Sequence, residues 1–137
     1  MELRVRNAFL ALILVQAAHS LEEYVFGLYE VFVPARLASS LVSGDPAVGF
    51  AILNLAIVAF GAWCYLFHVR SGTASGRTWV WPWVVVSVGN GLVHTTVAAV
   101  RGTYFPGVVT APFLFMVAAY IAIALLRDGT VSRRAAA

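Results

Sequence analysis

The chain has 137 residues, of which 61% are hydrophobic and 11% are charged, and its mean hydropathy is +0.88. Because soluble domains carry about 25% charged residues, this composition excludes an ordinary soluble domain and predicts one small integral membrane domain over residues 1–137. The formal net charge is +3, and the basic residues are Arg spread over loops and termini, which indicates a topology signal and no nucleic-acid partner.

Four apolar segments predict four membrane-spanning helices, because each is long enough to cross about 30 Å of hydrocarbon. Pro34 is expected to end the first helix, and residues 35–46 to form a polar connection. Residues 69–78, rich in Gly, Ser and Arg, are expected to form a flexible loop, and residues 128–137 a solvated, flexible tail. The predicted fold is all-α, an integral membrane four-helix bundle. Its helices are expected over residues 7–33, 47–67, 79–100 and 104–126.

The arginines are divided unequally between the two sides of this bundle. Two lie near the N-terminus, two in residues 69–78 and three in residues 127–137, all on one side, whereas Arg36 and Arg101 lie on the other. Positively charged loops stay in the cytoplasm, so we expect both termini to be cytoplasmic in a plasma membrane of bacterial type. Cleavage of a secretory signal after Ala17 is a disfavoured alternative, because hydrophobic sequence resumes at Tyr24.

Ionisable side chains interrupt the first apolar segment on one helical face. His19, Glu22 and Glu23 have the spacing i, i+3 and i+4 and project in one direction, with Glu30 near the same azimuth. An ionisable residue near the centre of a bilayer costs about 2.5 to 3.5 kcal/mol, and two adjacent carboxylates cost more unless they are paired. We therefore expect partners for these groups elsewhere in the chain.

A second polar face lies on the third segment, where Asn90 and His94 are spaced i, i+4. At about 1.5 Å per residue, His94 reaches a depth similar to that of His19 when both helices start from the cytoplasmic side. Tyr104 and Thr110 lie at the outer end of the fourth segment and are expected to roof the same cavity. One site built mainly by the first and third helices is therefore predicted.

Three interpretations of this cluster remain open. Two imidazoles with one or two carboxylates match the ligands of a catalytic zinc site or of a two-His-one-carboxylate iron site. In the second interpretation, a buried Glu and a His exchange protons with a substrate without a metal. In the third, the carboxylates pair with Arg101 and the histidines, and the network only fixes helix packing. Because ionisable groups within membranes usually mark function, a functional site is favoured.

The candidate residues divide into three expected roles. The expected ligands of a divalent metal, zinc or iron, are His19, Glu22, Glu23 and His94. The expected catalytic residues, one Glu among them acting as general base, are Glu22, Glu23, Asn90 and Tyr104. The expected substrate-binding residues are Arg101, Thr110 and Asn54. Whether Glu30 and Arg101 belong to the site is left open.

Three short motifs resemble, in this order, the signature motifs of the HXXEE family of small integral membrane proteins. They are His19-Ser20-Leu21-Glu22-Glu23, Asn90-Gly91-Leu92-Val93-His94 and Tyr104-Phe105-Pro106-Gly107. The resemblance covers essentially the whole chain and implies that the family's functional set includes His19, Glu22, Glu23, Asn90, His94, Tyr104, Pro106 and Gly107. It implies no particular reaction.

Two looser similarities rest on residue types alone. Intramembrane CAAX-type proteases also combine a Glu pair with His and Asn on later helices, but no Arg lies four residues after Glu23, so that activity is not carried over. Small membrane sterol isomerases likewise use acid–base Glu and His under aromatic walls.

The sequence thus favours a membrane metalloenzyme, hydrolase or oxidoreductase, acting on a lipid-like or small apolar substrate in the bilayer. The alternatives are a metal-free Glu/His isomerase and a proton- or cation-coupled binding or transport protein. Small residues such as Gly49, Gly61 and Gly89 suit either internal packing or the seam of a homodimer.

Overall fold

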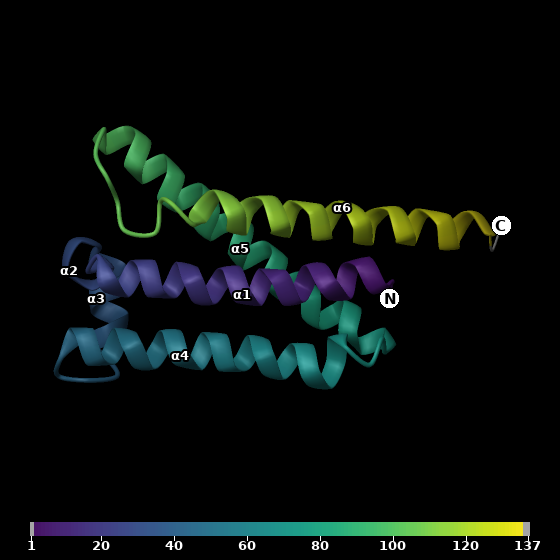
Figure 1. Cartoon of the computed structure of the whole chain (residues 1–137), viewed down its shortest axis with the longest axis horizontal. Helices are drawn as coiled ribbons and strands as arrows, with labels where there is room; N and C mark the ends of the chain where they lie inside the picture. Colours follow the sequence, from purple (N-terminus) through teal and green to yellow (C-terminus); the bar gives the residue numbers. More distant parts are fainter. Residues whose placement is uncertain (1, 136–137) are drawn as a thin grey trace.

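The computed structural model describes residues 2–135, which form helices joined by turns (Figure 1). In chain order these are α1 (Leu3–Val25), α2 (Leu28–Val31), α3 (Val33–Ser40), α4 (Pro46–Cys64), the π-helical turn η1 (Tyr65–Val69), α5 (Ala74–Arg101) and α6 (Ala111–Ala135). The prediction of an all-helical chain is therefore confirmed for the described residues.

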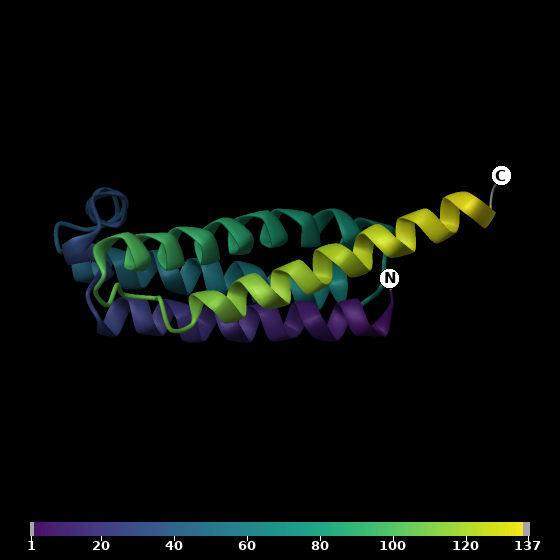
Figure 2. The same cartoon turned by 90° about the horizontal axis from the view of Figure 1, so that it is seen from above.

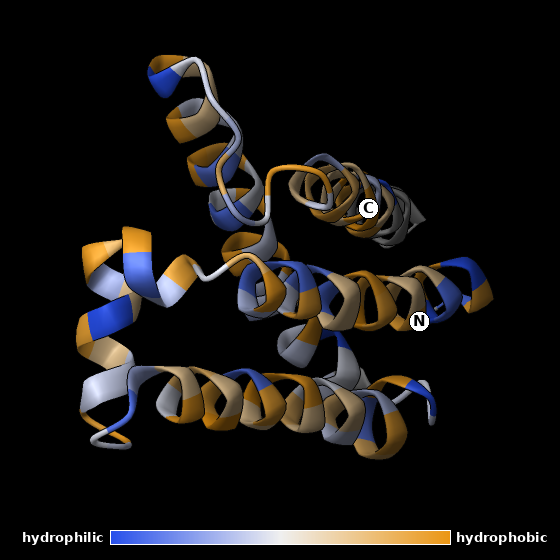
Figure 3. Cartoon of the chain, turned by 60° about the vertical axis from the view of Figure 1, so that its left-hand side comes forward, coloured by the Kyte–Doolittle hydropathy of each residue, from blue (hydrophilic) through white to orange (hydrophobic). Residues whose placement is uncertain are grey.

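Three segments are long and apolar enough to cross a membrane: Leu3–Val25, Pro46–Val69 and Ser75–Arg101. The apolar part of α6, Ala111–Arg127, is shorter. Hydrophobic residues predominate along α4 (Figure 3), and several large ones on it, including Leu55, are exposed. Among the described residues, three helices are therefore long enough to span a membrane, and the apolar part of a fourth helix is shorter than that length.

The long helices alternate in direction. α1 begins and α6 ends at the same end of the molecule (Figures 1 and 2). α6 packs along both α1 and α5, whereas α4 packs against α1 and α3. This arrangement brings the C-terminal half of α1 close to the end of α5 and the start of α6.

The single helix expected over residues 7–33 is instead divided into α1, α2 and α3. Gly27 adopts a left-handed conformation with φ of +67°, which L side chains rarely adopt, and α1 ends just before it. Pro34 does not end a helix but lies in the first turn of α3, where its missing N–H has no helical acceptor to lose. Part of the expected polar connection over residues 35–46 is therefore helical.

Other helix ends also differ from expectation. α5 begins within the loop expected over residues 69–78, and η1 carries α4 through to Val69. α6 begins at Ala111 because residues 102–110 form a turn that starts at Gly102, where φ is +64°. The expected flexible tail over residues 128–137 is helical as far as Ala135, and its residues 136–137 lie outside the described part.

Asp45 fixes the start of α4. Its carboxylate accepts hydrogen bonds from the backbone N–H groups of Ala47 at 2.9 Å and Val48 at 3.4 Å, and Pro46 occupies the first helical position. Both features are favoured at helix N-termini, because the first N–H groups lack acceptors within the helix. α4 therefore starts at a defined residue beside α3.

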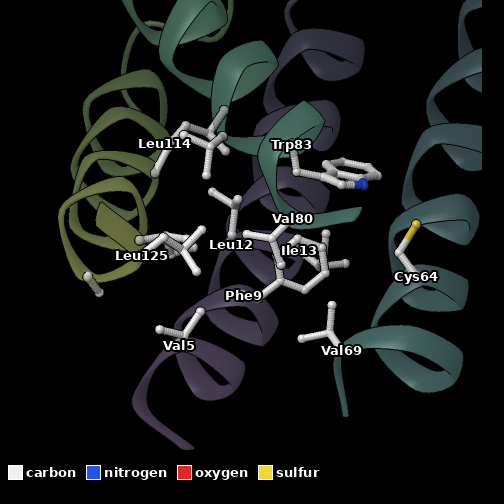
Figure 4. Close-up of a cluster of buried hydrophobic side chains, with 14 residues drawn as sticks. Val5, Phe9, Leu12, Ile13, Cys64, Val69, Val80, Trp83, Leu114 and Leu125 are labelled. Atoms are coloured by element: carbon white, nitrogen blue, oxygen red, sulfur yellow. The ribbon is translucent and has the colours of Figure 1, made fainter. Parts of the chain in front are cut away.

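A buried apolar cluster joins the N-terminal half of α1 to the other long helices (Figure 4). Phe9 packs edge-to-face on Trp83, with 6.3 Å between the ring centroids. The fully buried members include Val5, Phe9, Leu12, Cys64, Val69, Val80, Leu114 and Ile121. This cluster fixes the rotation of α1 about the helix axis, so the polar residues of α1 face α5 and the turn before α6.

Gly49 allows α4 to touch α3. A Cβ atom at residue 49 would lie 2.1 Å from the carbonyl oxygen of Ser39, which is backbone and has no flexible side chain to yield. Gly49→Ala is expected to lower the free energy of unfolding by about 1 to 3 kcal/mol, the usual cost of overpacking. Circular dichroism during denaturation in detergent measures the change.

Gly89→Ala is the matched control, because a Cβ there meets no atom within 4 Å and Ala is the better helix former. A Gly49→Ala protein as stable as the control would contradict this account of the α3–α4 contact.

Candidate metal centre

Two helices present their polar residues at the same spacing. His19 and Glu23 lie one turn apart near the end of α1, and Asn90 and His94 lie one turn apart on α5. His19, Glu23 and His94 are buried, with exposed fractions of 0%, 6% and 2%. Three ionisable side chains are thus enclosed together, which is costly unless they share protons or a cation.

The carboxylate of Glu23 joins the two imidazole rings. Its Oε1 lies 3.2 Å from Nε2 of His19 and 3.1 Å from Nε2 of His94. The ring centroids lie 4.8 Å apart with an angle of 81° between the planes. The two histidines therefore lie side by side, as the sequence predicts.

The partner of His94 determines which ring nitrogen carries its proton. Nδ1 of His94 lies 2.7 Å from the carbonyl oxygen of Pro106. A carbonyl oxygen only accepts hydrogen bonds, so Nδ1 carries the hydrogen and donates it. In the neutral ring, Nε2 of His94 therefore presents a lone pair toward Glu23.

The same reasoning applies to His19 through Thr110. The hydroxyl of Thr110 lies 2.5 Å from Oε2 of Glu22 and donates its hydrogen to that carboxylate. It must then accept from Nδ1 of His19, 2.7 Å away, so this nitrogen is the protonated one. Nε2 of neutral His19 consequently carries the lone pair, and it lies between the Asn90 amide nitrogen at 3.0 Å, from which it accepts a hydrogen bond, and Oε1 of Glu23 at 3.2 Å.

Three electron-pair donors thus converge, namely the two Nε2 atoms and a carboxylate oxygen of Glu23. Within the described chain, these residues form the group whose ligand atoms, all within 4.8 Å of one another, suit a metal ion. Two imidazoles and one carboxylate are the ligand set of many zinc and non-haem iron sites. Metal-binding histidines commonly donate their other N–H to a carbonyl or carboxylate, as both rings do here, through Thr110 in the case of His19.

Glu22 belongs to a different network, although it is adjacent to Glu23. Its carboxylate accepts hydrogen bonds from the Tyr104 hydroxyl at 2.8 Å, from the backbone N–H groups of Val109 and Thr110 at 3.1 and 2.9 Å, and from the Thr110 hydroxyl. Burial and the Glu22 carboxylate raise the pKa of Tyr104 to about 12, so the phenol keeps its proton. Glu22 therefore holds the turn over the site and lies outside the group of converging ligands.

The Tyr104-Phe105-Pro106-Gly107 stretch closes the site with its backbone. At Gly107, φ is +93°, and a Cβ atom there would lie 2.6 Å from Nδ1 of His94 and 2.8 Å from Cε1 of His19. The buried Phe105 ring packs against His94, with 5.3 Å between centroids. In this motif, Tyr104 donates a hydrogen bond, Phe105 packs on His94, the Pro106 carbonyl accepts and Gly107 leaves room for both rings.

The predicted substrate-binding residues lie at three different places. Thr110 bridges His19 and Glu22 within the site. Asn54 donates to the carbonyl oxygen of Phe50 on its own helix at 3.1 Å. Arg101 lies over the Phe105 ring, with 5.1 Å to the centroid, and is not a member of the metal-ligand group. The exposed Glu30 lies at α2, beside Gly27 and away from the site.

A cavity of about 530 Å³ adjoins the metal-ligand group. Its walls come from α1, α4, α5 and the α2–α3 segment, and they include His94, Glu23, Asn90 and Asn54. Gln16, which also lines it, was missed by the sequence reasoning even though it lies one turn before His19 and Ser20 on the same face of α1. The Pro106 carbonyl was also missed, since a backbone acceptor leaves no mark in the residue types.

Helices of membrane-spanning length around a buried His/Glu cluster define the class as a small all-helical protein with a candidate metal centre. The chain belongs to the HXXEE family, because the family model described as "Protein of unknown function with HXXEE motif" matches residues 10–122. The resemblance seen in the three motifs is thereby confirmed. No curated protein and no solved structure matches the chain.

Gly107→Ala is expected to disrupt the site, because its Cβ would overlap both imidazole rings. A residue forced into left-handed backbone costs about 1 to 2 kcal/mol, and displacement of the rings adds to that cost. Gly102→Ala supplies the comparison, since its φ is also positive but a Cβ meets nothing within 4 Å. Thermal unfolding in detergent should give the lower midpoint for Gly107→Ala; equal midpoints would exclude a contact role for Gly107.

Thr110→Val removes the hydroxyl that links His19 to Glu22 while keeping the side-chain shape. It leaves the Nδ1–H of His19 without its acceptor, which is expected to cost about 1 to 3 kcal/mol of stability. Thr110→Ser should restore most of that loss. Thr95→Val is the control, because that hydroxyl donates only to the Gly91 carbonyl of its own helix. Equal losses of stability in Thr110→Val and Thr95→Val, measured by denaturation, would refute the hydrogen-bonded link from His19 through Thr110 to Glu22.

Proposed function

We propose that this protein is an integral membrane enzyme that holds a divalent metal, zinc or iron, on His19, Glu23 and His94. The observation that carries the proposal is the convergence of two Nε2 lone pairs on a carboxylate oxygen inside the protein. Without a cation or a proton among these atoms, the His94 lone pair repels the Glu23 oxygen, and the His19 lone pair has only the Asn90 amide as a partner. A metal satisfies all three, and the Nδ1–H donors support that assignment.

The surroundings support a catalytic role for the metal over a purely structural one. Structural zinc sites usually have four protein ligands, whereas this group has three and adjoins a cavity. Such a metal supplies Lewis-acid chemistry and activates a bound water. Asn90 lies at the edge of the group and lines the cavity, where its amide is suited to orient a substrate. Glu22 and Tyr104 are positioning residues, since they act through Thr110 and the turn.

The exposed apolar helices support a position in a membrane. Four spans with both termini on the cytoplasmic side agree with the alternating helix directions and with the distribution of Arg. The cavity walls are mainly apolar, which suits a lipid-like substrate. Hydrolysis and oxidation both remain consistent with this ligand set.

Metal content tests the proposal directly. Protein purified in detergent, repleted with zinc or iron and desalted, is measured by inductively coupled plasma mass spectrometry. Wild type is expected to hold about one metal ion per chain, and His94→Ala and Glu23→Gln to lose it, because each removes one of three ligands. Glu22→Gln is expected to weaken metal affinity by about 10- to 100-fold, the usual effect of perturbing a ligand's hydrogen-bond partner.

His68→Ala and Glu30→Gln are the matched controls, since neither residue belongs to the metal-ligand group. His68 stacks on Trp79, and Glu30 lies at the surface. They should keep the metal. Wild type that stays metal-free after repletion, with its helical circular dichroism intact, would overturn the metal site. The converging acceptors would then share a proton, which is the chemistry of a metal-free acid–base isomerase.

A further inference from the structure

The walls of the cavity beside the metal centre are mostly hydrocarbon. Its apolar lining includes Phe50, Leu53 and Ile57 of α4 and Val86 and Val93 of α5. At about 530 Å³ it lies within the range of roughly 300 to 1,000 Å³ that is typical of small-molecule sites. It is therefore large enough for part of a lipid chain.

The cavity opens between α4 and α5 at the middle of both helices. Ile57, Val86 and Val93 line the cavity and are also 43%, 62% and 44% exposed, so they form its mouth. Ile57 and Val86 lie near the middle of the spans Pro46–Val69 and Ser75–Arg101. In a membrane, this mouth faces acyl chains and not the aqueous phase on either side.

The polar groups in the lining are amides and the site itself. Gln16, Asn54 and Asn90 each use one amide N–H in a hydrogen bond, and the second N–H of each has no acceptor among the described residues. No Arg or Lys is among the lining residues. An anionic headgroup drawn into the cavity would find no basic side chain and would face the Glu23 carboxylate, which is costly in a low-dielectric site.

We infer that the cavity between α4 and α5 binds an uncharged acyl lipid that enters sideways from the bilayer, with its ester or amide carbonyl beside Asn90 and the metal centre. The carbonyl oxygen accepts from the unused amide N–H of Asn90, and the chain lies along Ile57 and Val86. This inference rests on the proposed function for its metal but concerns the substrate class alone. Binding is therefore testable without a reaction.

Photolabelling tests the binding site. Purified protein in nanodiscs is irradiated with a monoacylglycerol that carries a diazirine in its acyl chain, and labelled residues are located by mass spectrometry. We expect labels on the cavity-facing parts of α4 and α5. Unlabelled monoacylglycerol should compete, whereas phosphatidic acid and a long-chain alcohol should compete at least about tenfold less well, a difference of 1.4 kcal/mol in binding.

Val86→Trp and Val85→Trp form a matched pair, because both are exposed valines at the middle of α5 and only Val86 lines the cavity. Val86→Trp should reduce labelling about tenfold, and Val85→Trp should leave it unchanged. Equal labelling of the two variants would overturn the site. Equal competition by phosphatidic acid would overturn the preference for an uncharged lipid, and equal competition by the alcohol would overturn the carbonyl contact.

His94→Ala separates this inference from the metal proposal. The variant is expected to lose the metal yet keep most of the labelling, since the apolar walls remain. If wild type holds no metal but is still labelled in the cavity, the metal proposal is refuted and the lipid-binding inference stands. A metal-loaded wild type without cavity labels would refute the lipid site and keep the metal.

Discussion

One oxygen atom of Glu23, shared between the imidazoles of His19 and His94, constrains the rest of this structure. A carboxylate buried among apolar helices costs several kcal/mol unless its charge is compensated. The surrounding groups are arranged to aim two lone pairs at that oxygen: the Pro106 carbonyl fixes one ring and the Thr110 hydroxyl fixes the other. The turn before α6 therefore belongs to the site as much as the helices do, and α1 and α5 meet at a single carboxylate.

The two adjacent glutamates perform different tasks because they face different neighbours. Glu23 points into the protein toward the histidines, whereas Glu22, about 100° away on the helix, faces the turn and is satisfied by donors from Tyr104, Val109 and Thr110. Because the oxygens of Glu22 already accept these hydrogen bonds, they have fewer lone pairs free for a metal. In the HxxEE pattern, one glutamate thus holds the turn over the site and the other belongs to the candidate metal centre.

Much of this site was predictable because helical spacing is a strong constraint. The i, i+4 pairs His19–Glu23 and Asn90–His94, and the roof formed by residues 104–110, follow from the sequence and simple helix geometry. The division of labour between Glu22 and Glu23 was not predictable, since adjacent residues differ only by which neighbour each meets. The break at Gly27 was missed because Gly is common within membrane helices, where only tertiary contacts decide whether it bends the chain. The position of Arg101 over the Phe105 ring likewise depends on tertiary contacts.

The contacts of the site join residues far apart in the chain: His19 meets Asn90 across 71 residues and Thr110 across 91. A ribosome adds about 5 to 20 residues per second, so α1 is synthesised on the order of 5 to 20 s before its last partner. Until α5 and then α6 are made, the polar face of α1 lacks the side chains that cover it in the finished structure. In a bilayer, the ionisable groups would disfavour α1 as an isolated helix, so its release from the insertion machinery together with α5 and α6 would cost less free energy. The side chains that form the candidate metal centre therefore also favour one order of helix assembly.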